Sequence, residues 1–189
     1  MKTLHAPAAV VYEVKQSKFL AHLVPYAAFD ATLERLKTEH PKARHFVTAY
    51  RCFNAFGQIV EGSSDDGEPK GTSGKPSLAV LAGYDLVDVA VVTVRYFGGT
   101  KLGTGGLVRA YTHAVSEAVS AASLAAYVKK ERTAFMCAYA AFSQVEYLVE
   151  KYGAEWVGKR FESDGVYCEV TASAEVLDAF LADAGRLIG

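Results

Sequence analysis

The sequence contains few cysteines, and no two of them are close together in the chain. Cys52, Cys137 and Cys168 form no CxxC pair, so their spacing fits neither a disulfide framework nor a zinc site. The chain also lacks an apolar run long enough to span a membrane, and its first residues do not resemble a signal peptide. These absences favour a reduced, cytoplasmic protein without a membrane partner.

Net charge is nearly absent as well. The 189 residues carry a formal net charge of −1, and the sequence pI is about 6.5, so the chain as a whole does not attract nucleic acid. A nucleic-acid site would therefore have to be a local basic patch. Apolar residues, by contrast, make up 51% of the chain, which is enough to build a core in one or two domains.

The most informative segment begins with Val89–Val94, in which β-branched residues do not alternate with polar ones. This pattern predicts a strand buried on both faces. A glycine-rich turn follows, and then a predicted helix that runs through an alanine-rich tail to Ala126. Apolar residues recur along this helix at spacings of three or four: Leu107, Tyr111, Ala114, Ala118 and Ala122.

A glycine-rich turn that leads into a helix is suited to binding an anion. The first N–H groups of a helix are unpaired and carry partial positive charge, and glycines let a ligand approach the backbone. The candidate phosphate ligands are the cations and glycines of this segment: Arg95, Gly98, Gly99, Lys101, Gly103, Gly105, Gly106 and Arg109. The segment is neither a Walker A nor a GxGxxG motif, and the alternative is a tight turn that binds no ligand.

The rest of the chain alternates between predicted strands and helices. In the first part we expect strands at Val10–Val14, Phe19–Val24, Arg44–Phe53 and Gln58–Glu61, and helices at Asp30–His40 and Ser77–Leu81. The charged segment Lys129–Arg132 predicts a boundary between domains at residues 1–128 and 129–189.

The second part has the strand and helix order of a ferredoxin-like domain. The expected strands are Thr133–Ala140, Ala154–Phe161, Val166–Thr171 and a very short Arg186–Ile188, and the expected helices are Val145–Tyr152 and Ala174–Ala184. Ser143 and Ser173 are predicted to cap the starts of these helices, and Gly153 to end the first of them.

A long polar loop before the glycine-rich segment contains three carboxylates, on Asp65, Asp66 and Glu68. Together they could bind Mg²⁺, with a phosphate completing the coordination shell. Adjacent acids in a loop rich in glycine and proline are also ordinary turn formers, because their side chains accept hydrogen bonds from nearby backbone amides. Both interpretations remain open from the sequence.

Two histidines are further candidates for the same cleft. His45 could act as a general base near neutral pH, or it could be a structural residue of its strand. Arg109 and His113 are one helical turn apart, so they can line one site or form a polar stripe that faces solvent. We predict that the loop Ser64–Pro69, called the acidic loop below, folds against Gly98–Gly106 with His45 and Arg109 nearby.

Three segments resemble the motifs of the IMPACT/YigZ family: SDDGEP at residues 64–69, RYFGGTKLGTGGLVRAY at residues 95–111, and ARHF at residues 43–46. The resemblance implies an N-terminal domain similar to the second domain of ribosomal protein S5 and to elongation-factor domain IV. It implies a C-terminal domain similar to elongation-factor domain V, as in the bacterial two-domain branch. Eukaryotic relatives regulate translation through a partner protein, whereas the bacterial relatives have no settled activity.

The leading hypothesis is a cytoplasmic, translation-associated protein that contacts RNA or a ribosome-linked partner. Its contact surface would consist of Lys101, Arg95, Arg109 and the glycine-rich loop, with Tyr96 and Phe97 available to stack on bases. The alternative is an enzyme that handles a phosphorylated or nucleotide substrate with Mg²⁺, because a similar fold occurs in small-molecule kinases. A module that binds a peptide or a protein without chemistry is a third hypothesis. The position of the acids discriminates the first two, since only the enzyme needs them to converge on the glycine-rich loop.

Overall fold

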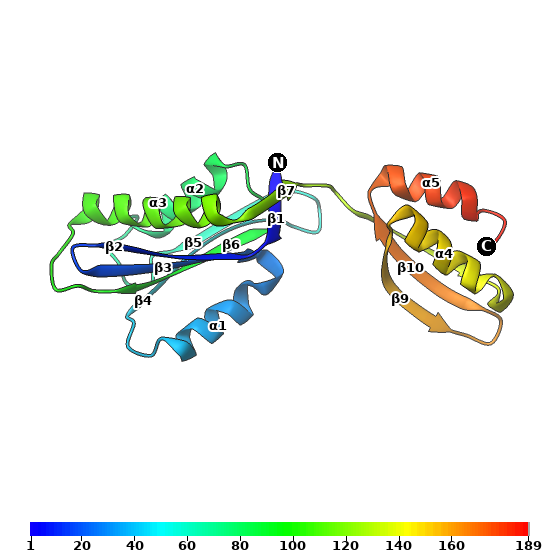
Figure 1. Cartoon of the computed structure of the whole chain (residues 1–189), viewed down its shortest axis with the longest axis horizontal. Helices are drawn as coiled ribbons and strands as arrows, with labels where there is room; N and C mark the ends of the chain where they lie inside the picture. Colours follow the sequence, from blue (N-terminus) through cyan, green and yellow to red (C-terminus); the bar gives the residue numbers. More distant parts are fainter. Residues whose placement is uncertain (189) are drawn as a thin grey trace. The chain divides into compact units, whose positions relative to one another are not determined.

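The computed structural model describes residues 1–188, which form two compact units (Figure 1). The N-terminal unit spans Met1–Tyr127, and the C-terminal unit begins at Val128. Both units combine strands with helices, so the predicted α/β class is confirmed. None of the helices formed by residues 1–188 is long and apolar enough to cross a membrane.

A five-stranded antiparallel sheet forms the centre of the N-terminal unit. Its strands lie in the order β2 (Ala8–Val14), β3 (Ser17–Pro25), β6 (Val89–Tyr96), β4 (His45–Phe53) and β5 (Ile59–Ser64). The central strand β6 is buried from Val89 to Arg95, which confirms the prediction from its unbroken apolar run. Because β3 and β4 flank β6, the start of each lies beside the end of β6, with Lys18 and His45 opposite Tyr96 and Arg95.

Helices cover both faces of this sheet (Figure 1). On one face lie α2 (Gly74–Gly83) and α3 (Thr104–Ala121), which bury Val89 and Val91 of β6. On the other face lies α1 (Phe29–Glu39), after the 3-10 turn η1 (Tyr26–Ala28), and it packs on Val92 and Val94. The alternation of β6 side chains between these two cores explains why the strand needs apolar residues at successive positions.

The helix predicted to run to Ala126 is shorter in the structure. The observed helix α3 ends at Ala121, and Ser123–Ala126 forms strand β7, which pairs with β1 (Lys2–Ala6) in a separate antiparallel ribbon. Alanine favours helix locally, but backbone pairing with the distant N-terminus decides the conformation here.

The C-terminal unit has the ferredoxin-like arrangement. It runs through β8 (Glu131–Cys137), the 3-10 turn η2 (Tyr139–Ala141), α4 (Phe142–Tyr152), β9 (Glu155–Phe161), β10 (Val166–Ala172) and α5 (Ala174–Ala184), with strand order β8-β10-β9. The expected final strand is reduced to one antiparallel bridge from Ile188 to Cys137 of β8, the position of a fourth ferredoxin-like strand.

The predicted caps of this unit meet different outcomes. Ser173 caps α5, since its hydroxyl accepts a hydrogen bond from the backbone N–H of Val176, and Gly153 ends α4 in the left-handed conformation. The prediction for Ser143 was wrong, because α4 already begins at Phe142 as a continuation of the preceding 3-10 turn.

Candidate functional site

Asp65 of the acidic loop organises the start of α2. Its carboxylate accepts hydrogen bonds from the Ser73 hydroxyl at 2.6 Å and from the backbone amides of Gly71 at 2.6 Å, Gly74 at 2.8 Å and Ser73 at 3.1 Å. Burial alone would raise the pKa of this carboxyl. The four hydrogen bonds outweigh burial, however, and lower the pKa of Asp65 to about 2.

Glu68 is the buried anchor of the acidic loop. Its carboxylate accepts two hydrogen bonds from Nη1 of Arg95, at 2.7 and 2.9 Å, and a third from the Tyr111 hydroxyl at 2.8 Å. Burial of Tyr111, followed by the negative charge of Glu68, raises the pKa of the tyrosine hydroxyl. The acidic loop is therefore joined to Arg95 before the glycine-rich loop and to Tyr111 after it.

Asp66 fixes the orientation of His45. The Asp66 carboxylate accepts a hydrogen bond from the Phe46 backbone amide at 2.6 Å, and the Asp66 carbonyl oxygen lies 2.8 Å from Nδ1 of His45. Because a carbonyl oxygen can only accept, Nδ1 must carry the proton. In the neutral ring, Nε2 is then an acceptor, and it has no hydrogen-bond partner among residues 1–188.

These contacts bear on the Mg²⁺ hypothesis for Asp65, Asp66 and Glu68. Each carboxylate already accepts hydrogen bonds from protein donors, and Glu68 is neutralised by a guanidinium. Within residues 1–188, no group of three or more His, Cys, Asp or Glu side chains is arranged to hold a metal ion. The acidic loop does not fit a resident magnesium ion, and its acids serve the structure of the loop.

The glycines of the glycine-rich loop have different roles. A Cβ added to Gly98 would lie 2.0 Å from the backbone carbon of Gln16 and 2.2 Å from the Ser17 nitrogen, so Gly98 is needed for close packing on the β2–β3 turn. Gly99 and Gly103 have φ of +84° and +73°, and an added Cβ at either would meet no heavy atom of residues 1–188 within 4 Å.

The glycine-rich loop leads directly into α3, as predicted. Gly103 is the N-cap residue, and the first turn of the helix has no acidic side chain and no side-chain cap from residues 1–188. An added Cβ at Gly105 would lie 3.6 Å from Arg109 and one at Gly106 would lie 3.0 Å from Leu102. Gly103, Thr104 and Gly105 are exposed, so an anion can approach the backbone amides at this helix start from solvent.

A cavity of about 310 Å³ lies between β2 and the start of α3. Its polar lining comes from Lys15, Arg109 and His113, together with the Gly106 backbone. The His113 ring packs against Tyr12, with ring centroids 4.4 Å apart, and its Nε2 lies 3.1 Å from the Glu117 carboxylate. Arg109 and His113 thus line the same cavity, whereas His45 lines a different one.

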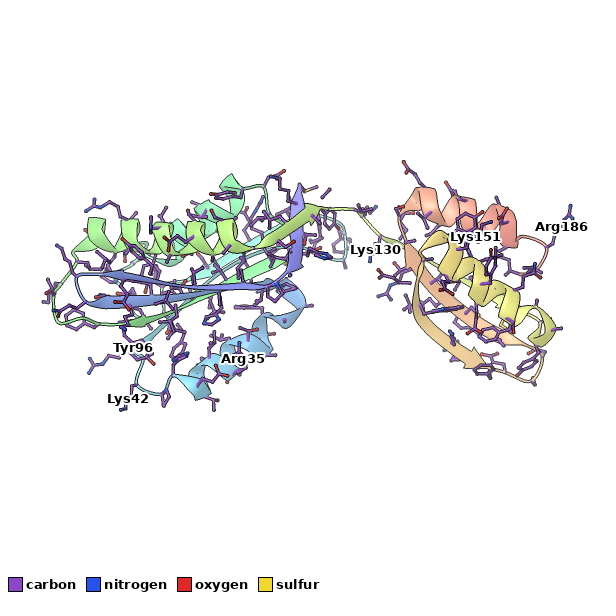
Figure 2. The ribbon with its side chains drawn as sticks, in the orientation of Figure 1. Arg35, Lys42, Tyr96, Lys130, Lys151 and Arg186 are labelled. Carbon is purple, nitrogen blue, oxygen red and sulfur yellow. The ribbon has the colours of Figure 1, made fainter. Side chains whose placement is uncertain are left out.

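A second cavity, of about 390 Å³, lies where the α1–β4 connection meets the end of β6. Its lining residues are Lys42, Arg44, His45, Arg95, Tyr96 and Phe97, and they include no carboxylate. Figure 2 labels Lys42 on the connection and Tyr96 at the end of the strand. Sequence reasoning did not select Lys42, Arg44 or Lys15 as site residues. The sequence signal for the first two was the basic run from Lys42 to His45 just before a strand.

The two cavities belong to one end of the sheet, because the loop from Phe97 to Gly106 connects them. Five exposed cations gather there and form no ion pair with any residue from 1 to 188: Lys15, Lys42, Arg44, Lys101 and Arg109. We call these five residues and the glycine-rich loop the cationic end. Arg95 differs from them because it is buried and its Nη1 is paired with Glu68.

An α/β unit with a cationic, glycine-rich loop at one sheet end, followed by a ferredoxin-like unit, defines a two-domain class of protein. Residues 15–119 match the model of the Impact N-terminal domain family. The chain is 37% identical to an IMPACT family member of Haemophilus influenzae, covering 95% of this chain and 92% of the relative. It is 35% identical to the IMPACT family member YigZ of Escherichia coli, covering 96% of this chain and 91% of the relative.

The chain therefore belongs to the IMPACT family, which confirms the family resemblance seen in its motifs. A crystal structure described only as that of a hypothetical protein is similar over 98% of this chain and 91% of its own. Its TM-score is 0.75 and its sequence identity is 32%.

Proposed function

We propose that this protein is a cytoplasmic, translation-associated protein that binds RNA through the cationic end of its N-terminal unit. One observation carries the proposal: five exposed cations without carboxylate partners lie at the end of the sheet where a glycine-rich loop leads into α3. Lysine, arginine and backbone amides at a helix start hold phosphates without reading base sequence. The family's resemblance to ribosomal-protein and elongation-factor folds, and to regulators of translation, supports this cellular context.

The balance of charge at this end supports RNA over the metal-dependent enzyme. The chain has a net charge of −1, but the three acids of the acidic loop are used internally, by Arg95, by α2 and by the backbone of β4. Two further acids at this end, Glu13 and Glu117, contact Lys18 and His113. The local surface is therefore basic although the whole chain is not. A magnesium-phosphate enzyme would need those same carboxylates free, so no observation favours it.

The test reverses two of the five cations in one variant, Lys101→Glu with Arg109→Glu. Binding of an unstructured RNA is measured by fluorescence anisotropy over a range of salt concentrations. The slope of log K against log salt is negative, and each lost phosphate contact should reduce its magnitude by about 0.7. The slope of the double variant should therefore be less steep by about 1.4, and the variant should bind RNA more weakly.

The matched control is Lys2→Glu with Lys129→Glu, which makes the same change in net charge elsewhere. Lys2 pairs with Ala126, beyond the C-terminal end of α3, and this 18-residue helix is about 27 Å long. The control should keep the wild-type slope. Equal slopes in the two variants would remove the cationic end as the site, and no RNA binding by the wild type at low salt would refute the proposed function.

A further inference from the structure

We propose that the 390 Å³ cavity lined by Lys42, Arg44, His45, Arg95, Tyr96 and Phe97 binds a nucleoside carrying a terminal phosphate monoester. This inference rests on the proposed function, because it assigns a specific ligand group to one part of the cationic end. The source of the nucleotide is either the phosphorylated end of an RNA chain or a free nucleotide, and the experiment below separates the two.

The charge of the cavity matches a monoester better than a diester. Arg95 is offset by Glu68 at 2.7 Å, and no carboxylate lines the cavity, so the side chains of Lys42 and Arg44 contribute two positive charges that are not offset there. A phosphate monoester carries about −1.5 to −2 at pH 7, whereas an internal diester carries a single negative charge. A terminal phosphate therefore balances the cavity, and a chain phosphate leaves it with excess positive charge.

Two polar groups of the cavity have capacity for a ligand. The side chain of Arg95 is only 7% exposed, and its Nη1 donates hydrogen bonds to Glu68. Its Nε is also buried but has no hydrogen-bond acceptor among residues 1–188. A phosphate oxygen would supply that acceptor. His45 presents Nε2 as an acceptor while Asp66 holds Nδ1, which suits a ribose hydroxyl.

The aromatic side of the cavity suits a base. Phe97 is 56% exposed, and Cζ of Arg95 lies 5.8 Å from the centroid of its ring. Tyr96 is held by a contact of 2.9 Å between its hydroxyl and Nδ1 of His40, so the position of its ring at the cavity is fixed. An exposed aromatic ring next to cations is the combination on which unpaired bases stack.

The size of the 390 Å³ cavity favours the terminal nucleotide of an RNA over an internal one. Its volume is near the lower limit of the range of about 300–1,000 Å³ that is usual for small-ligand sites. It therefore accommodates one nucleotide unit rather than a strand that passes through. The connected loop with Lys101 and Arg109 is then available for the phosphates that follow along an RNA chain.

The experiment compares one short unstructured RNA in three forms: with a 5′-phosphate, with a 3′-phosphate, and with hydroxyls at both ends. The wild type should bind one phosphorylated form about tenfold more tightly than the hydroxyl form, the effect of one to two added charge-assisted hydrogen bonds. The cavity variant Lys42→Gln with Arg44→Gln should lose this preference, so that it binds the phosphorylated and hydroxyl forms with equal affinity. Both side chains are exposed, so the melting temperature should not change.

The matched variant Lys101→Gln with Arg109→Gln should weaken binding of all three forms and keep the preference. Equal wild-type affinities for the three forms, or a preference that survives in the cavity variant, would overturn the inference and leave the proposed function standing. A nucleoside monophosphate alone, titrated by calorimetry, tests the free-nucleotide source. If no RNA binds at all, the proposed function fails, and nucleotide binding that the cavity variant abolishes would still support the inference.

Discussion

The acidic loop and the cationic end are the two charged regions that the sequence singles out, and they use their charge in opposite ways. The carboxylates of Asp65, Asp66 and Glu68 all accept hydrogen bonds from protein groups, at distances of 2.6–3.1 Å. The five cations of the cationic end form no ion pair within residues 1–188. The number of charges in a region therefore does not show whether they are available to a ligand, and the partners of each charged group must be examined.

Burial distinguishes Glu68, the anchor of the acidic loop, from the cations of the cationic end. A carboxylate removed from water is stable only if donors surround it, and Glu68, with 3% of its side chain exposed, has three hydrogen bonds. Exposed lysines and arginines remain hydrated and need no partner in the free protein. They can exchange water for phosphate at little cost, which is the property of a surface that binds polyanions.

The comparison between the two regions predicts the largest loss of stability for Glu68→Ala. Removing the carboxylate leaves the buried Arg95 guanidinium without its partner, which should cost about 3–5 kcal/mol of unfolding free energy. Urea unfolding, followed by hydrogen exchange of the β6 amides, measures the loss.

The matched control for this prediction is the double variant Glu68→Ala with Arg95→Met. It removes the pair together and should recover part of the lost stability, because no unpaired charge remains. A cost below about 1 kcal/mol for Glu68→Ala, typical of an exposed ion pair, would show that the acidic loop is not anchored as described.

A second and smaller effect separates two glycines of the glycine-rich loop. In Gly98→Ala the new methyl group would meet the Gln16 and Ser17 backbone at 2.0–2.4 Å, so the β2–β3 turn must move, at a cost of about 1–3 kcal/mol. Gly105→Ala adds a methyl group 3.6 Å from Arg109 inside α3 and should stabilise the protein by up to about 1 kcal/mol. Thermal unfolding of the two variants tests this, and equal shifts would contradict the assigned packing role of Gly98.

Much of the fold was predictable because it depends on local patterns. The apolar run of β6, the left-handed cap at Gly153 and the N-cap at Ser173 each depend on neighbouring residues alone. Strand β7 was missed because its alanine-rich sequence favours helix, and only pairing with β1 reveals it. Ser143 was a good cap residue by type, but the chain enters α4 one turn earlier through a 3-10 segment.

The candidate site was predictable in its residue types and not in its partners. Glu68 finds Arg95 and Tyr111 at sequence separations of 27 and 43 residues, and nothing local indicates either contact. The same holds for Lys42 and Arg44, which the α1–β4 connection brings to the end of β6. Tertiary placement decided which charged groups have partners within residues 1–188 and which remain exposed without one.

The smallest expected effect concerns Asp65, and it changes with pH. The pKa of Asp65 is lowered to about 2 in the folded protein, against about 3.9 in an unfolded chain. A lowered folded-state pKa stabilises the protein above the unfolded value, and the stabilisation disappears as pH falls from about 4 to about 2. After allowance for screening by water, Asp65→Asn should lower the free energy of unfolding by about 1–2 kcal/mol at pH 7, and the stabilities of wild type and variant should converge near pH 2.

The control is Asp164→Asn, because Asp164 is exposed and accepts no hydrogen bond from residues 1–188, and it should show no such pH dependence. A constant difference between wild type and Asp65→Asn across this range of pH would mean that the carboxylate's charge plays no part in capping α2. In that case the negative charge of Asp65 would not stabilise the acidic loop, and the contrast between the partnered acids of this loop and the unpartnered cations of the cationic end would no longer hold.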